Sequence, residues 1–183
     1  MSHAGVPTAW VVVSNGVLAG VVGGLAGGLV FGVIMQVTGI VLLVAALVGG
    51  STAGVGWGVH LAISILFGLI YVVLFRRWLG PWGTTIMLGL SYGWLWWVLG
   101  GLLIMPTWLG SPEMVMTLNV TAWQSLGGHI LYGLALGAVY AVLHRRLDRG
   151  RSGRLEPVGP GYLPRGVAVR AGPGYRRRRV RSW

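Results

Sequence analysis

The sequence contains no cysteine and no lysine, and only three of its residues are acidic. Without cysteine the chain has no disulfide framework, no thiol nucleophile and no Cys-based zinc or iron–sulfur site. Charged residues make up 9% of the chain, whereas soluble domains carry about 25%. Hydrophobic residues make up 55% and the mean hydropathy is +0.75. This composition excludes an ordinary soluble domain and predicts an integral membrane protein.

The few charges are distributed unevenly along the chain. Residues 1–143 hold two arginines and one glutamate, whereas residues 144–183 hold twelve arginines and two acidic residues. We therefore divide the chain into an apolar body, residues 1–146, and a basic tail, residues 147–183. The tail is rich in Gly, Pro and Arg, a composition typical of segments that do not fold alone. We expect an extended, Arg-rich cytoplasmic tail.

Three stretches of the body have the length and hydropathy of membrane-spanning helices. They run from Gly54 to Phe75, from Thr84 to Met105 and from Ala122 to Leu143, each close to the roughly 20 residues that cross a bilayer. Residues 10–50 are uncharged. At about 1.5 Å per residue this stretch is too long for one span and barely long enough for two. Hydropathy alone therefore leaves four or five helices.

An internal repeat bears on this count. When the chain is aligned with itself at an offset of 69 residues, ten of the 26 positions in residues 52–77 are identical to their counterparts. His60 and His129 are one such pair. The repeat units are residues 14–77 and 83–146, and an internal repeat of this kind indicates one structural unit used twice.

The repeat indicates that residues 38–50 do not form a second span. Their counterpart, residues 107–119, contains Pro112 and Glu113, and a carboxylate is costly inside a membrane. We expect both to be outer interfacial segments; a re-entrant form of 38–50 or a fifth span is the alternative. The predicted fold class is an all-α integral membrane protein with four transmembrane helices, built as a tandem parallel repeat of a two-helix unit.

The arginines determine the expected orientation. With four spans, the pairs at 76–77 and 145–146 lie on the same side as the tail, and only Glu113 lies on the other. The positive-inside rule then places both termini in the cytoplasm, with the body in the cell (inner) membrane. Two spans per unit relate the repeats by a pseudo-twofold axis along the membrane normal.

Small residues recur every fourth position on the predicted helices and therefore share one helix face. Such rows allow two helix backbones to approach closely. A bare face is alternatively a slot for a flat or linear apolar ligand, such as a carotenoid, a quinone or an acyl chain. The predicted helix-packing residues are Gly16, Gly20, Gly24, Gly28, Gly32, Ser64, Gly68, Gly133 and Gly137.

His60 and His129 are the candidate cofactor-binding residues, because they occupy equivalent positions at equal depth in the two units. Imidazole is the usual axial ligand of haem iron, and an ionisable residue inside a membrane indicates a functional site. Haem b, a chlorin or a carotenoid is a candidate ligand, and none is required. A structural hydrogen bond to a carbonyl and a proton or ion relay are the alternatives. We expect no metal site, because no cysteine or carboxylate accompanies the pair.

Aromatic residues are the other notable feature of the predicted spans. Trp94, Trp96 and Trp97 lie too deep for an interfacial belt, so they either fill the core or form a wall against a pigment, a lipid or a neighbouring subunit. Tyr71 and Tyr140 are expected near the inner interface, where a phenol hydroxyl stays hydrated.

The arginines near and beyond the last helix are predicted to dock onto a partner. Juxtamembrane arginines attract anionic lipid head groups, at about 1 kcal/mol each, and an acidic protein surface is the alternative. Nucleic acid, which also binds Arg-aromatic segments, is the less favoured partner. The predicted docking residues are Arg145, Arg146, Arg149, Arg176, Arg177, Arg178, Arg179 and Arg181.

These features favour a non-catalytic membrane subunit of a larger assembly, of respiratory or photosynthetic type. It would pack against other membrane-protein subunits through its Gly and Trp faces and dock through its tail. A haem- or pigment-binding protein is one alternative, and a small transporter or channel is the other. We expect no enzyme, because the chain has no paired carboxylates, Ser-His-Asp set or phosphate loop. The polar residues of the transporter hypothesis are Gln36, His60, Ser64, Gln124, Ser125 and His129.

Overall fold

The computed structural model describes the backbone of residues 9–152 and the side chains of residues 15–147, and this part contains helices and loops but no strand. Four helical stretches are long and apolar enough to cross a membrane: Asn15–Thr38, Ala53–Phe75, Trp82–Trp108 and Val120–Leu147. For the described residues, the prediction of an all-helical chain with four helices of membrane-spanning length and hydropathy is confirmed. The elements in chain order are α1 (Ala9–Thr38), α2 (Ile40–Ala46), α3 (Ala53–Phe75), α4 (Trp82–Trp96), the π-helix η1 (Trp97–Ile104), α5 (Met105–Trp108), the 3-10 turn η2 (Pro112–Met114) and α6 (Val120–Ser152).

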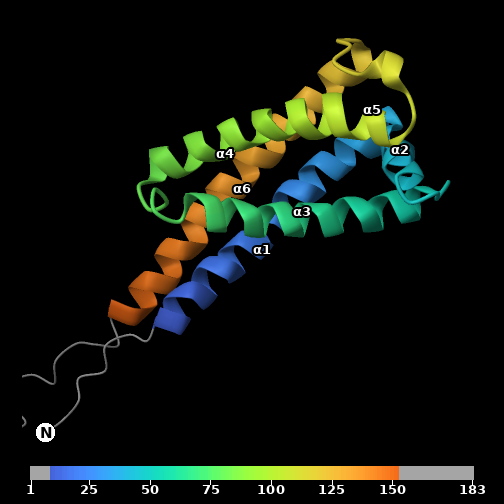
Figure 1. The fold of residues 1–183 in the computed structure, drawn as a ribbon. Coiled ribbons are helices and arrows are strands. Elements are labelled where there is room, and N and C mark those ends of the chain that lie inside the picture. The colour runs from blue at the N-terminus through green and yellow to red at the C-terminus, as the bar shows by residue number, and fades with distance from the viewer. Residues whose placement is uncertain (1–8, 153–183) are drawn as a thin grey trace, which may run out of the picture.

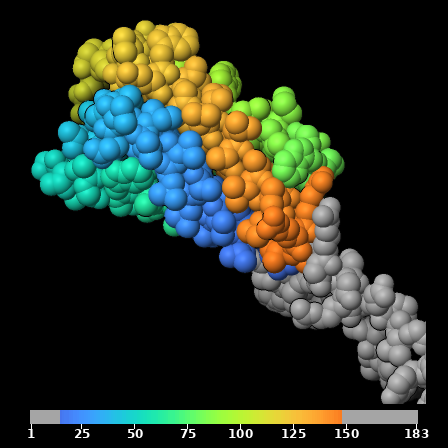
Figure 2. All heavy atoms as spheres, turned by 180° about the vertical axis from the view of Figure 1, so that it is seen from behind, coloured from blue at the N-terminus to red at the C-terminus, as the bar shows by residue number. Residues whose placement is uncertain are grey.

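The four long helices form two layers. In Figure 1, α3 and α4 run in front of α1 and α6, which cross behind them at an angle. Figure 2 shows the opposite side, where α1 and α6 lie next to each other. Helix α1 packs along both α3 and α6, and α6 packs along α4, whereas the backbones of α3 and α4 approach each other at few positions. Larger side chains therefore fill the space between α3 and α4.

Glycines allow α1 to approach α3 within backbone contact. A Cβ atom added at Gly20 would lie 2.8 Å from the main-chain oxygen of Gly68, and one at Gly68 would lie 2.9 Å from Cα of Gly24. At Gly28 it would lie 2.6 Å from the hydroxyl oxygen of Ser64. These distances leave no room for a side chain, so α3 fills the glycine face of α1.

Helices α4 and α6 cross in a similar way. We call α1 and α3 the first hairpin, and α4 and α6 the second. A Cβ added at Gly89 would overlap the main-chain oxygen of Gly133, and one at Gly93 would overlap that of His129. At Gly137 it would lie 2.9 Å from the main-chain oxygen of Thr85. Both hairpins therefore rest on glycine-to-backbone contacts, which van der Waals packing and close approach make favourable in a membrane.

Buried tyrosines connect the helices through their hydroxyl groups. Tyr71 of α3 is fully buried and donates to the main-chain oxygen of Thr85 at 2.7 Å, and Tyr92 of α4 donates to that of Phe67 at 2.9 Å. The prediction that Tyr71 keeps its hydroxyl in water is therefore wrong. The main-chain oxygen of α4 satisfies the hydroxyl instead, as burial in an apolar environment requires.

The third span is not one regular α-helix. Its middle is the π-helix η1, and Pro106 follows in the first turn of α5. The prediction that the span ends at Met105, before this proline, is wrong. Proline lacks an amide hydrogen, and the first turn of a helical segment tolerates that loss. The amide of Met116, in the loop after α5, donates to the Leu102 oxygen at 3.0 Å, the oxygen that residue 106 would bond in an α-helix.

The structure adds detail to the predicted interfacial segment after α1. Residues 38–50 contain the short helix α2, which packs against α3 and buries Ile40 and Val41. Gly39 permits the sharp turn from α1 into α2, since its φ of 80° is left-handed.

Helix α6 continues to Ser152, so residues 147–152 of the predicted extended tail are helical. No proline lies between Val120, where α6 begins, and Pro157, which leaves the helix free to continue.

Candidate ligand cavity

The two histidines line one cavity of about 450 Å³, although they lie 69 residues apart in the sequence. The cavity is bounded by α1, α2, α3, the α4–η1–α5 span and α6, at the end of the bundle away from the arginine pairs. Its wall is largely apolar; the side chains with polar atoms are those of His60, His129 and Ser125, together with the indoles of Trp96 and Trp108. Its size falls within the roughly 300–1,000 Å³ typical of small-molecule sites.

Each imidazole is held by a main-chain oxygen. Nε2 of His60 lies 2.9 Å from the oxygen of Gly28, and Nδ1 of His129 lies 2.8 Å from the oxygen of Ser125. A carbonyl oxygen only accepts, so these two nitrogens carry the hydrogen. In the neutral imidazoles, Nδ1 of His60 and Nε2 of His129 are then hydrogen-bond acceptors. The predicted structural hydrogen bond is present at both residues, and each ring keeps one acceptor nitrogen.

Phe31 of α1 contacts both imidazoles. Its ring centroid lies 5.3 Å from that of His60 and 4.7 Å from that of His129. Phe31 reaches this position because it packs directly on the backbone at Gly128, where a Cβ atom would overlap the ring. The sequence pattern singled out neither Phe31 nor Gly128, because the contact joins two different helices and follows no periodicity within either.

Aromatic residues form another part of the cavity wall, between α3 and α4. Phe67 and Trp96 stack with centroids 3.9 Å apart and planes inclined by 16°. The predicted tryptophan group therefore divides into three environments. Trp96 lines the cavity, Trp97 is buried and donates to the Ala122 oxygen at 2.9 Å, and Trp94 is 54% exposed.

The π-helix places two glycines in the cavity wall. Gly100 and Gly101 both line the cavity, and a Cβ atom added at Gly101 would lie 3.6 Å from Cε1 of His129. π-Helical turns occur frequently at functional sites. In this chain the π-helix sets a bare stretch of backbone beside His129 and Ser125.

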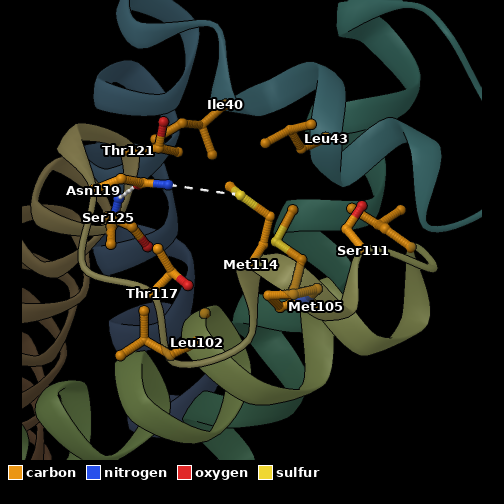
Figure 3. A pocket seen from close by; sticks show the side chains of 14 residues that line it. Ile40, Leu43, Leu102, Met105, Ser111, Met114, Thr117, Asn119, Thr121 and Ser125 are labelled. Carbon is orange, nitrogen blue, oxygen red and sulfur yellow. Dashed lines mark hydrogen bonds between the residues drawn. The ribbon is translucent and has the colours of Figure 1, made fainter.

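A smaller pocket of about 120 Å³ adjoins the cavity on the side of the loop after α5. The two share Ile40, Gly101, Met105 and Ser125 as lining residues. Figure 3 shows the pocket from close by, with polar side chains including those of Ser111, Thr117, Asn119 and Thr121 around it. The apolar cavity thus continues into a more polar pocket at the end of the bundle.

The predicted helix-packing residues are buried between helices and do not line this cavity. Gly32 packs on Trp57. A Cβ atom added at Gly16 would lie 3.6 Å from the hydroxyl oxygen of Tyr140. A second row of glycines on α1 was not among the predicted packing residues. Gly23 and Gly27 pack against Leu136 and Tyr132 of α6, and their spacing of four residues is the signal that marks such a row.

The six polar residues of the transporter hypothesis do not form one path. Ser125 lines the cavity with the two histidines. Ser64 is buried and donates to the His60 oxygen at 2.7 Å. Gln36 and Gln124 are exposed, and Gln36 accepts a hydrogen bond from Trp57 at 3.0 Å. Only half of the set therefore shares a cavity.

The predicted docking arginines fall partly outside the described residues. Arg145 and Arg146 are exposed about two turns before the end of α6, and Arg145 lies over the ring of Trp82 at 5.5 Å from its centroid. Its guanidinium also donates to the Gly80 oxygen at 3.4 Å. The side chain of Arg149 lies outside the described side chains, and the remaining predicted residues lie outside the described chain: Arg176, Arg177, Arg178, Arg179 and Arg181.

Within the described residues, no group of three His, Cys, Asp or Glu side chains is placed to hold a metal ion. The fold and the cavity define a class: an all-helical chain with four helices long and apolar enough to cross a membrane, with a largely apolar cavity between them. In comparisons with family models, curated proteins and solved structures, no family, protein or structure matches the chain.

Proposed function

We propose that the protein is a non-catalytic integral membrane protein that holds an apolar small molecule in the two-histidine cavity. One observation carries this proposal. Residues from all four spans and from α2 line about 450 Å³ of space, and the two histidines contribute polar groups to a largely apolar wall. Small-molecule sites combine an apolar lining with a small number of placed polar groups in this way.

The hydrogen bonds of the histidines favour a ligand that carries a hydroxyl group. Nδ1 of His60 and Nε2 of His129 accept hydrogen bonds, since the other nitrogen of each ring donates to the main chain. A hydroxyl group is a donor that matches an acceptor nitrogen. The proposed class is therefore a hydroxylated ring with an apolar chain, such as a prenylated hydroquinone.

This arrangement disfavours a haem held between the two imidazoles. Nε2 of His60 bonds the Gly28 oxygen, and the ring of Phe31 packs on both histidines. A macrocycle between the rings would have to displace Phe31 from Gly128, where the side chain packs on bare backbone. An absorption spectrum of the purified protein would reveal a chlorin or a carotenoid bound beside the histidines.

The experiment compares two tryptophan substitutions in the same π-helix. Ile104 lines the cavity and is 50% exposed, whereas its neighbour Leu103 is 42% exposed and does not line it. Protein purified in mild detergent is extracted, and its lipophilic molecules are identified by mass spectrometry. We expect I104W to retain about tenfold less ligand, equivalent to about 1.4 kcal/mol, and L103W to retain as much as the wild type.

Two outcomes of that experiment would contradict the proposal. The first is a wild-type preparation that carries only bulk lipid. The second is equal retention by I104W and L103W, which would place the ligand elsewhere. Substitution of both histidines by phenylalanine removes the two acceptor nitrogens. The double variant is expected to bind a hydroxylated ligand more weakly than the wild type, whereas its affinity for a purely apolar ligand is expected to stay the same.

Membership in a larger assembly is a second proposed role, supported by the outward face of α4. Ser91 is exposed there between Met87, which is 62% exposed, and Trp94, which is 54% exposed. Serine on a lipid-facing surface is a typical hydrogen-bonding residue of helix–helix contacts. Packing on a respiratory or photosynthetic complex would cover it. In native gels of membrane extracts, W94L is expected to shift the protein to lower mass, whereas L66A on exposed α3 surface is not.

We further propose a tandem parallel duplication with both termini in the cytoplasm and the basic tail at the inner surface. Two features support it. Glycine crossings occur in both hairpins, at Gly20 with Gly68 and at Gly89 with Gly133, although their registers differ by one helical turn. Both arginine pairs lie at the same end of the bundle, because Arg76 and Arg77 line a pocket with His144, which directly precedes Arg145.

A further inference from the structure

A second large pocket, of about 510 Å³, lies at the arginine end of the bundle between α1, α3 and α6. It is separate from the two-histidine cavity and shares no lining residue with it. Its apolar half is formed by Val17 of α1 and by Val72 and Val73 of α3, and Val73 is 71% exposed. This half of the wall is open toward the lipid side of the helices.

The other half of the pocket is polar and basic. Arg76 and Arg77, at the end of α3, line it together with Tyr140 and His144 of α6, whose rings lie 5.4 Å apart. Both arginines are exposed. Among the described side chains, none that lines the pocket is acidic, and the only carboxylate is Glu113, in the loop that precedes α6. No described carboxylate therefore neutralises Arg76 and Arg77.

A glycine forms the α1 side of the pocket wall. Gly16 of α1 faces it, and a Cβ atom at this position would touch the hydroxyl of Tyr140 and a methyl group of Val72, each at 3.6 Å. A large side chain would occupy the space between α1 and the arginines. The apolar candidate span of α3 ends at Phe75, so the basic half begins where this apolar stretch ends.

We propose that this pocket binds one anionic phospholipid. The phosphate group lies against Arg76 and Arg77, because guanidinium groups bind phosphate oxygens through paired N–H donors. An acyl chain of the same molecule lies along Val72 and Val73, at the depth where lipid tails begin. Basic pockets between transmembrane helices on the cytoplasmic side are recognised in this way by lipid head groups.

The apolar half of the pocket distinguishes a lipid from free phosphate. Inorganic phosphate would use the arginines but would leave the valine wall without a partner. A lipid satisfies both halves at once, and the membrane supplies it at high local concentration. The site is therefore assigned to a head group that stays attached to its acyl chains.

The test uses the full-length chain in nanodiscs of phosphatidylcholine that contain a minor fraction of phosphatidylglycerol. Lipid that stays bound after transfer to mild detergent is measured by native mass spectrometry. We expect the wild type to retain one phosphatidylglycerol per chain in preference to phosphatidylcholine. R76Q/R77Q is expected to reduce this retention about tenfold, because it removes both phosphate contacts.

R145Q/R146Q serves as the charge-matched control, since it removes the same charge from the same end of the bundle but from outside the pocket. Arg145 and Arg146 are themselves predicted to attract anionic head groups, but from outside the pocket, so this variant is expected to reduce retention of the bound lipid much less than R76Q/R77Q does. Equal loss in the two double variants would mean diffuse attraction and would overturn the proposal. Displacement of the lipid from wild-type protein by inorganic phosphate would also overturn it, and that arm does not depend on the folding of any variant.

Discussion

The hydroxyl of Tyr132 donates a hydrogen bond to the main-chain oxygen of Ser64 at 2.8 Å. This bond joins α6 to α3, which belong to different hairpins. Tyr132 reaches across because α1 is bare at this level: a Cβ atom at Gly27 would lie 2.8 Å from Cδ2 of the tyrosine ring. The bond lies one helical turn from His60 along α3, so it fixes the helices that form the base of the two-histidine cavity.

Substitution of Tyr132 by phenylalanine tests this connection. The variant keeps the ring and removes the hydroxyl, and we expect the free energy of unfolding to fall by about 1 kcal/mol. Gly27→Val is expected to cost more, about 1–3 kcal/mol, because its side chain collides with the ring. Unfolding in detergent, followed by tryptophan fluorescence, measures both. A Y132F variant as stable as the wild type would show that the bond contributes nothing.

The glycine crossings give a matched pair of substitutions. At Gly24 a Cβ atom would overlap the Ser64 oxygen, and at Gly58 on the outer face of α3 it would meet nothing within 4 Å. We expect Gly24→Ala to destabilise the protein by about 1–3 kcal/mol through overpacking. Gly58→Ala is expected to be neutral or to stabilise by up to about 1 kcal/mol, since alanine is the better helix former. Thermal unfolding of both variants in the same detergent decides between them.

If the two alanine variants unfold at the same temperature, α1 and α3 do not pack through the glycine row. The corresponding substitution in the second hairpin is Gly93→Ala, whose Cβ would overlap the His129 oxygen. It is expected to resemble Gly24→Ala in its effect and, in addition, to displace His129 and weaken ligand retention.

The loop after α5 supports the π-helix through Met116. This residue has a φ of 56° and donates its amide to the Leu102 oxygen. Met116→Pro removes the amide and cannot adopt a positive φ, so we expect a loss of at least about 2 kcal/mol. Met116→Gly keeps the amide and adopts this φ without strain, and its stability is expected to equal or exceed that of the wild type.

Unfolding midpoints of these two variants, together with ligand retention, provide the measurement. The proline variant is expected to lose both stability and ligand, because the π-helix forms part of the cavity wall. Equal behaviour of the proline and glycine variants would show that the Met116 amide does not support η1.

The proposed orientation can be tested directly because the chain contains no cysteine. Each single-cysteine variant then carries one thiol. In intact cells, a membrane-impermeant maleimide is expected to label Glu113→Cys but not Arg77→Cys or Arg146→Cys, which require permeabilised cells. Labelling of Arg77→Cys and Arg146→Cys from opposite sides would contradict a four-span body with parallel hairpins.

The sequence alone predicts the spans well because long apolar helices leave a strong local signal. Gly54 and Ala53, the predicted and observed starts of the second span, differ by one residue. The error at Met105 has a non-local cause. Proline normally ends a helix, and the Met116 amide that satisfies the Leu102 oxygen lies ten residues beyond Pro106.

The candidate site was only partly predictable for a similar reason. The equivalent positions of His60 and His129 marked them as a pair, and the structure places both at one cavity. The same pattern says nothing of Phe31, which lies between α3 and α6 in contact with both rings. A contact among three helices depends on their relative rotation, which periodicity within one helix does not determine.

The π-helix makes the cavity depend on chain length as well as on residue type. In an α-helix each residue turns the chain by about 100°, and the wide turns of Trp97–Ile104 accommodate their residues at a different angle. Deleting one residue from this segment would return it toward α-helical geometry and rotate Met105 and Trp108 away from the cavity. Deletion of a single residue from this segment is therefore expected to abolish ligand retention. Most conservative replacements in the same segment are expected to preserve it.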